Sequence, residues 1–347
     1  FLKYGSTSTR SDLMAEARHE MDWLLSMQIL PEEVLSVRVP LALKEKEPID
    51  LNSPTHGFDK SFDGSSGARV ANDDVDPKYG LIPSTVTFGN ASGKRNYELP
   101  RYKINFPLTT INDPQGLVFS AVRDKDWTEI PTSPEKDAQP RVLDYPTTHA
   151  TLAFAAVAAQ ASRLWKGIDS EYSRKCLEAA DRALVAAKKY SSIYRYGEFS
   201  DGVSSVVPAI NVGGGAYADT DIIDAFNWAS TELYLAKSRA GGVDDGPAKQ
   251  ALADINKYGG LRFLSLGYAE SFSWKYNRNM GLLSVLVNGR HIDIAKKMTA
   301  IGYPTADDFV MNTFKTVLNG YLISIRASDF GVPHGKTEIF NWASNAD

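Results

Sequence analysis

The sequence predicts a mainly α-helical fold, a helical barrel or bundle interrupted by one long irregular insertion. From residue 149 onward, apolar residues recur at helical spacing in one segment after another. The connections between these segments are short, as in stacked helical hairpins. By contrast, residues 29–115 contain clusters of Pro, Gly, Asn, Asp and Ser, and this stretch is far longer than an ordinary connection.

Capping and breaking residues mark where the helices begin and end. Ser11 is suited to cap the first helix and Pro31 ends it, while Asp169 is expected to cap a later one. Alanine dominates the segment 149–165, so neighbouring helices can approach it closely. Within the insertion, short β-branched runs at 34–39 and 84–88 predict strands. The predicted helices cover residues 11–28, 149–165, 169–190, 220–237, 247–257, 280–288, 292–301 and 305–325.

Composition excludes several classes of function. The net charge of −4 gives no electrostatic reason to bind nucleic acid or an anionic membrane. No apolar run approaches the roughly 18 residues that a membrane span needs, and the N-terminus has no signal-peptide pattern. The single cysteine, Cys176, allows no internal disulfide and shares a helical face with alanines, so we expect a buried apolar residue.

A series of short motifs occurs in one order along the chain. Together they cover residues 1–28 and 116–347, while residues 29–115 match poorly. The motifs are LMAEAR at 13–18, DWLLSMQ at 22–28, GLVF at 116–119, DKDWT at 124–128, PR at 140–141, ATLAFAAVAAQ at 150–160, GGGAY at 213–217, VPHG at 332–335 and NWASN at 341–345. In this order they resemble the catalytic domain of glycoside hydrolase family 9, the inverting cellulase family.

This resemblance implies a fold and an activity. The expected fold is an (α/α)6 barrel over residues 1–347, with 29–115 as an insertion, and without the N-terminal immunoglobulin-like module. The expected activity is inverting hydrolysis of β-1,4-glucosidic bonds in cellulose or related β-glucans, by two carboxyl groups. The substrate is a polysaccharide or oligosaccharide, no cofactor is required, and the expected location is extracellular or periplasmic.

The catalytic residues of the family have no counterpart among these motifs. The family's Asp-Ala-Gly-Asp motif should lie shortly before residue 1, and its acidic Glu and sugar-binding His-Arg pair should lie beyond residue 347. We therefore expect the sequence to be a fragment, or part of a longer chain. A catalytically dead protein is the other interpretation of the same departure.

Four residues are candidates for contacts with sugar. Trp127 can stack on a glucose ring, or it can pack its loop onto the barrel. The Arg141 guanidinium can hydrogen-bond sugar hydroxyls, or pair with Asp126 or Asp144. Tyr217 can contact the sugar, or it can be a structural residue in the wall of the expected substrate cleft. Trp342 can line that cleft.

A structural calcium site is implied for the segment that opens the helix at 220–237. The resemblance assigns Thr220, Asp221 and Asp224 as ligands, and oxygen donors suit this cation. The Glu usual after the last Asp is Ala225 here, and an Asp expected near residues 273–276 is missing. The alternative is that these acidic residues cap the helix and complement its dipole.

Two other classes of function remain compatible with the sequence. One is a catalytically inactive, carbohydrate-binding helical barrel. The other is a different (α/α)6 enzyme that acts on polysaccharides, such as a lyase.

Overall fold

The computed structural model describes the elements of two compact units, and each unit is considered by itself. The first unit comprises residues 1–49 and 57–220, and the second comprises 50–56 and 221–347. The described residues are 12–31, 34–40, 86–88, 108–124, 131–138, 141–143, 145–193, 222–238, 246–258, 277–288 and, between 312 and 327, only isolated helical positions.

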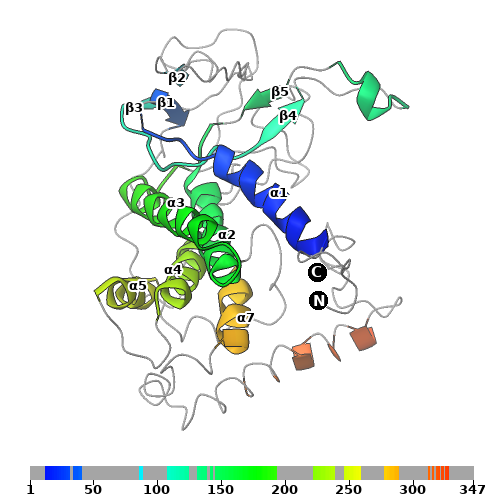
Figure 1. Ribbon diagram of the computed structural model, residues 1–347, viewed down its shortest axis with the longest axis vertical. Coiled ribbons are helices and arrows are strands. Elements are labelled where there is room, and N and C mark those ends of the chain that lie inside the picture. The colour runs from blue at the N-terminus through cyan, green and yellow to red at the C-terminus, as the bar shows by residue number, and fades with distance from the viewer. Residues whose placement is uncertain are drawn as a thin grey trace. The chain divides into compact units, whose positions relative to one another are not determined.

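The first unit combines helices with two small antiparallel sheets (Figure 1). One sheet has the order β2-β1-β3, and the other pairs β4 with β5. A 3-10 turn, η3, lies between β4 and β5 in the chain. The elements are α1 (Asp12–Ser26), β1 (Val34–Pro40), β2 (Val86–Phe88), β3 (Leu108–Ile111), β4 (Val122–Asp124), η3 (Pro134–Lys136), β5 (Arg141–Leu143), α2 (Thr148–Trp165) and α3 (Ser170–Lys189).

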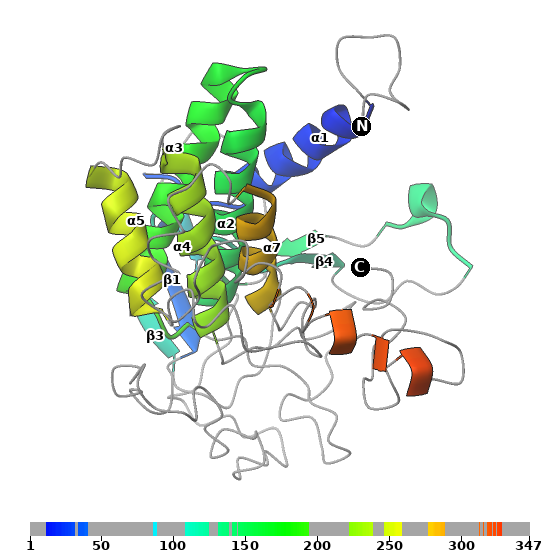
Figure 2. The ribbon, with the colours of Figure 1, turned by 90° about the horizontal axis from the view of Figure 1, so that it is seen from below.

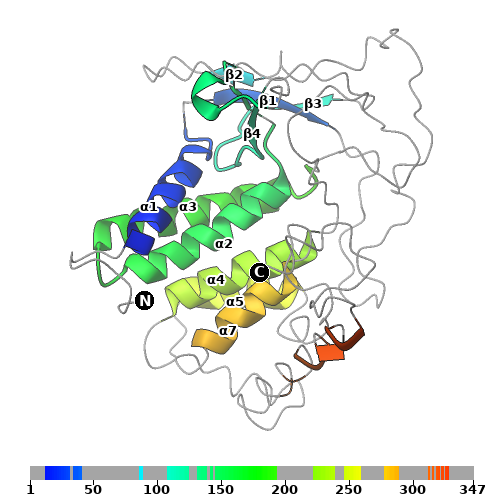
Figure 3. The ribbon, with the colours of Figure 1, turned by 90° about the vertical axis from the view of Figure 1, so that its right-hand side faces the viewer.

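Helices α2 and α3 form a tightly packed hairpin, side by side in Figures 1 and 3. Their facing sides consist largely of alanines with no solvent exposure, so little side-chain volume separates the two backbones. The Ser173 hydroxyl donates to the Ser162 carbonyl at 2.7 Å. Trp165 and Tyr172 meet edge to face, with ring centroids 5.4 Å apart. The hairpin buries Cys176 completely, and this burial raises the pKa of its thiol to about 11. Both the alanine interface and the inert cysteine confirm the sequence predictions.

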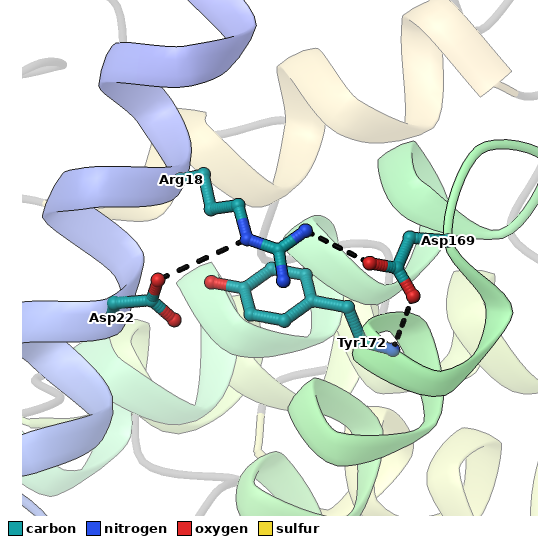
Figure 4. Close-up of polar contacts among 4 residues, drawn as sticks. All are labelled: Arg18, Asp22, Asp169 and Tyr172. Carbon is teal, nitrogen blue, oxygen red and sulfur yellow. Dashed lines mark hydrogen bonds and ion pairs between the residues drawn. The ribbon is translucent and has the colours of Figure 1, made fainter.

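Helix α1 is fastened to the start of α3 by one arginine (Figure 4). The Arg18 guanidinium lies 4.0 Å from the centroid of the Tyr172 ring and 2.8 Å from the carboxylate of Asp169. The same carboxylate accepts the Tyr172 amide at 3.0 Å, which makes Asp169 the predicted N-cap of α3. The hydrogen bond and charge of Asp169 raise the pKa of Arg18. One carboxylate thus both caps a helix and binds its neighbour.

The second unit contains three packed helices, α4, α5 and α7, which lie together in Figure 3. Helix α4 is buried on all sides from its first residue to Leu235, including Phe226 and Trp228. Phe226 stacks on Tyr258, and the buried Glu232 carboxylate accepts a hydrogen bond from Ser284. The bounds are α4 (Ile223–Lys237), α5 (Gly246–Lys257) and α7 (Arg278–Asn288).

The predicted elements agree with the structure where it describes them. Strands are found at both predicted runs, in β1 and β2, and the helices are displaced from the predicted bounds by at most a few residues. Helix α4 begins at Ile223, with Ile222 as an N-cap that makes no side-chain hydrogen bond, whereas the prediction began it at Thr220. The predicted helix at 292–301 and residues 220–221 lie outside the described residues. The mainly helical fold is confirmed.

Gly116 occupies a position that only glycine fits. Its φ angle is +88°, and a Cβ atom there would lie 2.7 Å from the Arg182 carbonyl oxygen. Gly167 is the matched control because a Cβ there would meet nothing within 4 Å.

We expect Gly116→Ala to lower the free energy of unfolding by about 2–3 kcal/mol, through backbone strain and the clash with α3. Gly167→Ala should change it by less than about 0.5 kcal/mol. Urea unfolding of both variants measures the difference, and equal effects would contradict the close approach at Gly116.

Candidate substrate-binding site

A two-stranded antiparallel ribbon precedes α2 and contains one of the predicted sugar contacts. Val122 pairs with Leu143, and Asp124 pairs with Arg141 at the far end of the ladder. Figure 2 shows β4 and β5 projecting away from α2 and α3. The chain then leaves the ribbon at Asp124 and returns at Arg141, and Trp127 belongs to this intervening stretch.

The ribbon keeps one register down to its base. An isolated bridge pairs Phe119 with Pro146, in register with the β4–β5 ladder. Beside it, the Ser120 amide and hydroxyl both donate to the Tyr145 carbonyl, at 3.3 and 2.8 Å. The Thr147 amide donates to the Val118 carbonyl at 3.4 Å. Residues 118–124 therefore run antiparallel to residues 141–143 and 145–147 in one register, and Arg141 lies at the end remote from α2.

Three buried threonines join the ribbon base to α2. The Thr147 hydroxyl caps the helix by accepting the Ala150 amide at 3.2 Å. The Thr148 hydroxyl donates to the Tyr190 carbonyl and accepts the Ile193 amide, at 2.5 and 3.0 Å. The Thr151 hydroxyl donates to the Thr147 carbonyl at 2.7 Å and accepts the Val118 amide at 3.0 Å. These hydroxyls satisfy backbone groups that would otherwise be buried without partners.

A buried glutamine completes the base from the other side of residues 116–119. The Gln28 side chain donates to the carbonyls of Gly116 and Ala179, at 3.3 and 2.9 Å, and accepts from Arg182 at 3.1 Å. Gln28 also forms a backbone bridge with Val118. The Gln28 side chain is only 1% exposed, and its amide makes hydrogen bonds to residues 116 and 179 and to Arg182, so the base also contacts α3.

The structure places Arg141 but not the other predicted sugar contacts. Arg141 begins β5 directly opposite Asp124 in the ladder. Their pairing is a backbone register of the β4–β5 ladder. The partners predicted for Arg141 from the sequence were Asp126 and Asp144. The position opposite Arg141 is set by strand pairing, which cannot be predicted from neighbouring residues alone. Trp127, Tyr217, Trp342, Asp126 and Asp144 lie outside the described residues.

Of the three predicted calcium ligands, only Asp224 lies among the described residues. Its buried carboxylate accepts the Ala225 amide at 2.8 Å and the Asn277 amide at 2.7 Å, so it ties the start of α4 to the start of α7. These bonds use two of the roughly four acceptor positions of a carboxylate and do not exclude a cation. In the described part of the chain, no group of three or more His, Cys, Asp or Glu side chains could hold a metal ion.

Comparison with known proteins decides the family. The family model for glycosyl hydrolase family 9 matches residues 98–347, which include the ribbon and all the helices from α2 onward. The chain belongs to glycosyl hydrolase family 9. This membership confirms the resemblance predicted from the ordered motifs and removes other (α/α)6 families from consideration.

The similar proteins are much longer than this chain. The chain is 31% identical to a cellulose 1,4-β-cellobiosidase of Acetivibrio thermocellus over 71% of its own length and 27% of the relative's. It is 38% identical to endoglucanase C of Cellulomonas fimi over 39% of its own length and 12% of that relative's. A solved structure, Bacteroides ovatus GH9, aligns with 63% of this chain and 36% of its own, at 22% identity and a TM-score of 0.47. The chain thus spans about a quarter of the first relative's length.

Within the described residues of this family 9 chain, no helix is both long and apolar enough to cross a lipid bilayer.

His149, in the first turn of α2, is expected to make the stability of the folded chain depend on pH. Burial in the first turn of α2 lowers its pKa to about 4, from an ordinary value of 6.5. The unfolded chain therefore binds a proton between pH 6.5 and 4 that the folded chain does not, so stability falls as the pH decreases through this window.

We expect the free energy of unfolding to decrease by up to about 3 kcal/mol from pH 6.5 to pH 4 because of His149. His149→Gln should remove this part of the pH dependence, whereas substitution of the exposed His19 by Gln should retain it. Urea unfolding across the pH range measures both, and an unchanged slope in His149→Gln would contradict the burial of a neutral imidazole.

Proposed function

We propose that this chain is part of an enzyme that hydrolyses β-1,4-glucosidic bonds in cellulose or a related β-glucan. The observation that supports this most strongly is the family 9 match over residues 98–347. The names of the two relatives, a cellobiosidase and an endoglucanase, support the same bond and substrate class. Because a glucan polymer is too large to enter a cell, we also propose an extracellular or periplasmic location.

The proposed chemistry is inverting hydrolysis by two carboxyl groups. One is protonated and donates its proton to the leaving oxygen, while the other is ionised and activates a water molecule on the opposite face of the sugar. The two lie about 6.5–9.5 Å apart, which leaves room for that water. We propose that both groups come from sequence outside residues 1–347, and that this chain supplies the helical scaffold and part of the substrate contacts.

The ribbon is the proposed substrate-contacting element among the described residues. Arg141 lies at its far end, and Trp127 follows Asp124 by three residues in the sequence. A guanidinium and an indole together offer a hydrogen-bonding fork and a flat apolar face. A glucose unit presents hydroxyls at its edge and C–H groups on its face, which match both. We propose Tyr217 and Trp342 as further contacts.

The product anomer tests the reaction. Intact protein should release a first product in the α configuration from a β-linked gluco-oligosaccharide, because inversion reverses the anomeric centre. Proton NMR during the first minutes distinguishes the anomers before they interconvert. A β-anomer would contradict inversion, and no cleavage at all would favour the catalytically inactive, carbohydrate-binding alternative.

Trp127→Ala should raise KM for cello-oligosaccharides about tenfold, equivalent to about 1.4 kcal/mol of lost stacking, with kcat little changed. Trp127→Phe should recover most of the loss because a flat ring remains. Trp23→Ala is the matched control, since Trp23 is a half-exposed tryptophan of α1 with no proposed sugar contact. Steady-state kinetics of the intact protein measure all three, and equal KM values for Trp127→Ala and Trp23→Ala would remove Trp127 from the site.

Calcium is proposed as a structural ion held by Thr220, Asp221 and Asp224, with no role in bond cleavage. Chelation with EDTA should then lower the melting temperature by several degrees, and added Ca²⁺ should restore it. Asp224→Asn should abolish that calcium response. If EDTA has no effect while Asp224→Asn still lowers the melting temperature, Asp224 stabilises the unit by its amide hydrogen bonds alone.

A further inference from the structure

We propose that Thr151 is a positioning residue for substrate binding, acting through the ribbon that ends at Arg141. The inference rests on the proposed function, because it requires that the far end of the ribbon contacts the glucan. Thr151 itself lies in the first turns of α2, is completely buried and does not touch substrate.

The Thr151 hydroxyl links α2 to the extended segment at residues 116–120. It accepts the Val118 amide at 3.0 Å and donates to the Thr147 carbonyl at 2.7 Å. Val118 precedes β4 and Thr147 follows β5, and the two residues are joined by the Thr147 amide in register with that ladder. A single hydroxyl therefore bonds both strands of the ribbon at its base and fixes them against one helix.

A small tilt of the ribbon at its base produces a larger displacement at its far end. Six residues separate Thr147 from Arg141, which corresponds to about 20 Å at the rise of an antiparallel strand. A tilt of about 5° at the base would then displace Arg141 by roughly 2 Å, by simple geometry over that length. Displacements of about 1 Å are sufficient to weaken an oriented contact with a ligand. The base, although remote, thus controls the position of Arg141.

Thr148 provides a matched control. Its hydroxyl is equally buried and also accepts one amide, from Ile193, and donates to one carbonyl, that of Tyr190. These partners lie at the end of α3 and just beyond it, not in the ribbon. Replacing either threonine by valine leaves the shape nearly unchanged and orphans one buried amide. The two variants should therefore be destabilised alike but differ in their effect on the ribbon.

The test compares Thr151→Val, Thr151→Ser and Thr148→Val in the intact enzyme, with cellotetraose as substrate, well below all melting temperatures. Both valine variants should lose about 3–6 °C in melting temperature. Thr151→Val should raise KM about fivefold with kcat within about twofold of wild type, because ground-state binding and transition-state binding weaken together. Thr151→Ser should restore KM, and Thr148→Val should leave it unchanged.

Equal KM values for Thr151→Val and Thr148→Val would overturn the inference and leave Thr151 a purely structural residue. Arg141→Ala separates this from failure of the proposed site. If Arg141→Ala raises KM while Thr151→Val does not, only the positioning role is lost, whereas no effect of Arg141→Ala removes the ribbon from the site altogether. Should Thr151→Val not fold, Ser120→Ala, which removes one bond between the same strands, is expected to raise KM about twofold, and an unchanged KM would overturn the inference.

Discussion

The first unit depends on the hydrogen bonding of buried backbone at the start of α2. Three extended segments, around residues 28, 118 and 146, meet there beneath the α2–α3 hairpin. Extended segments that are not part of a large sheet leave amides and carbonyls unpaired, and an unpaired buried group costs about 1–3 kcal/mol. The Gln28 amide and the hydroxyls of Thr148 and Thr151 satisfy these groups. Apolar side chains of the same shape could fill the space, but they could not form these hydrogen bonds.

The base of the ribbon is closely packed against the helices. The base is packed on both helices and excludes Cβ atoms at Gly116, so its geometry has little freedom. The chain leaves the ribbon at Asp124 and returns to it at Arg141, at the end remote from that base. If the far end of the ribbon contacts substrate, as proposed, those contacts can change without disturbing the helical scaffold. The proposed roles agree with this arrangement: Thr151 positions the base of the ribbon, and Arg141 contacts the substrate at its far end.

Local sequence signals predicted the helices well, because each signal needs only neighbouring residues. The alanine-rich segment 149–165 predicted a close approach by neighbouring helices, and Asp169 was predicted as a cap from its position before an amphipathic segment. The ribbon and its Asp124–Arg141 pairing were not predicted, since strand register depends on contacts between segments far apart in sequence. For the same reason, the threonines appeared only as ordinary helix residues. The family and the mainly helical fold could be predicted from ordered motifs, but the roles of Trp127, Tyr217, Trp342, Thr220 and Asp221 stay predictions.

The central claim is that the far end of the ribbon contacts a glucan chain. A crystal structure of the intact enzyme with bound cellotetraose tests it most directly. The account predicts a glucose ring within hydrogen-bonding distance of the Arg141 guanidinium, with the ribbon in the same register from Phe119 to Asp124. A cellotetraose molecule bound elsewhere, with Arg141 paired to Asp124 and turned away from every sugar, would contradict it.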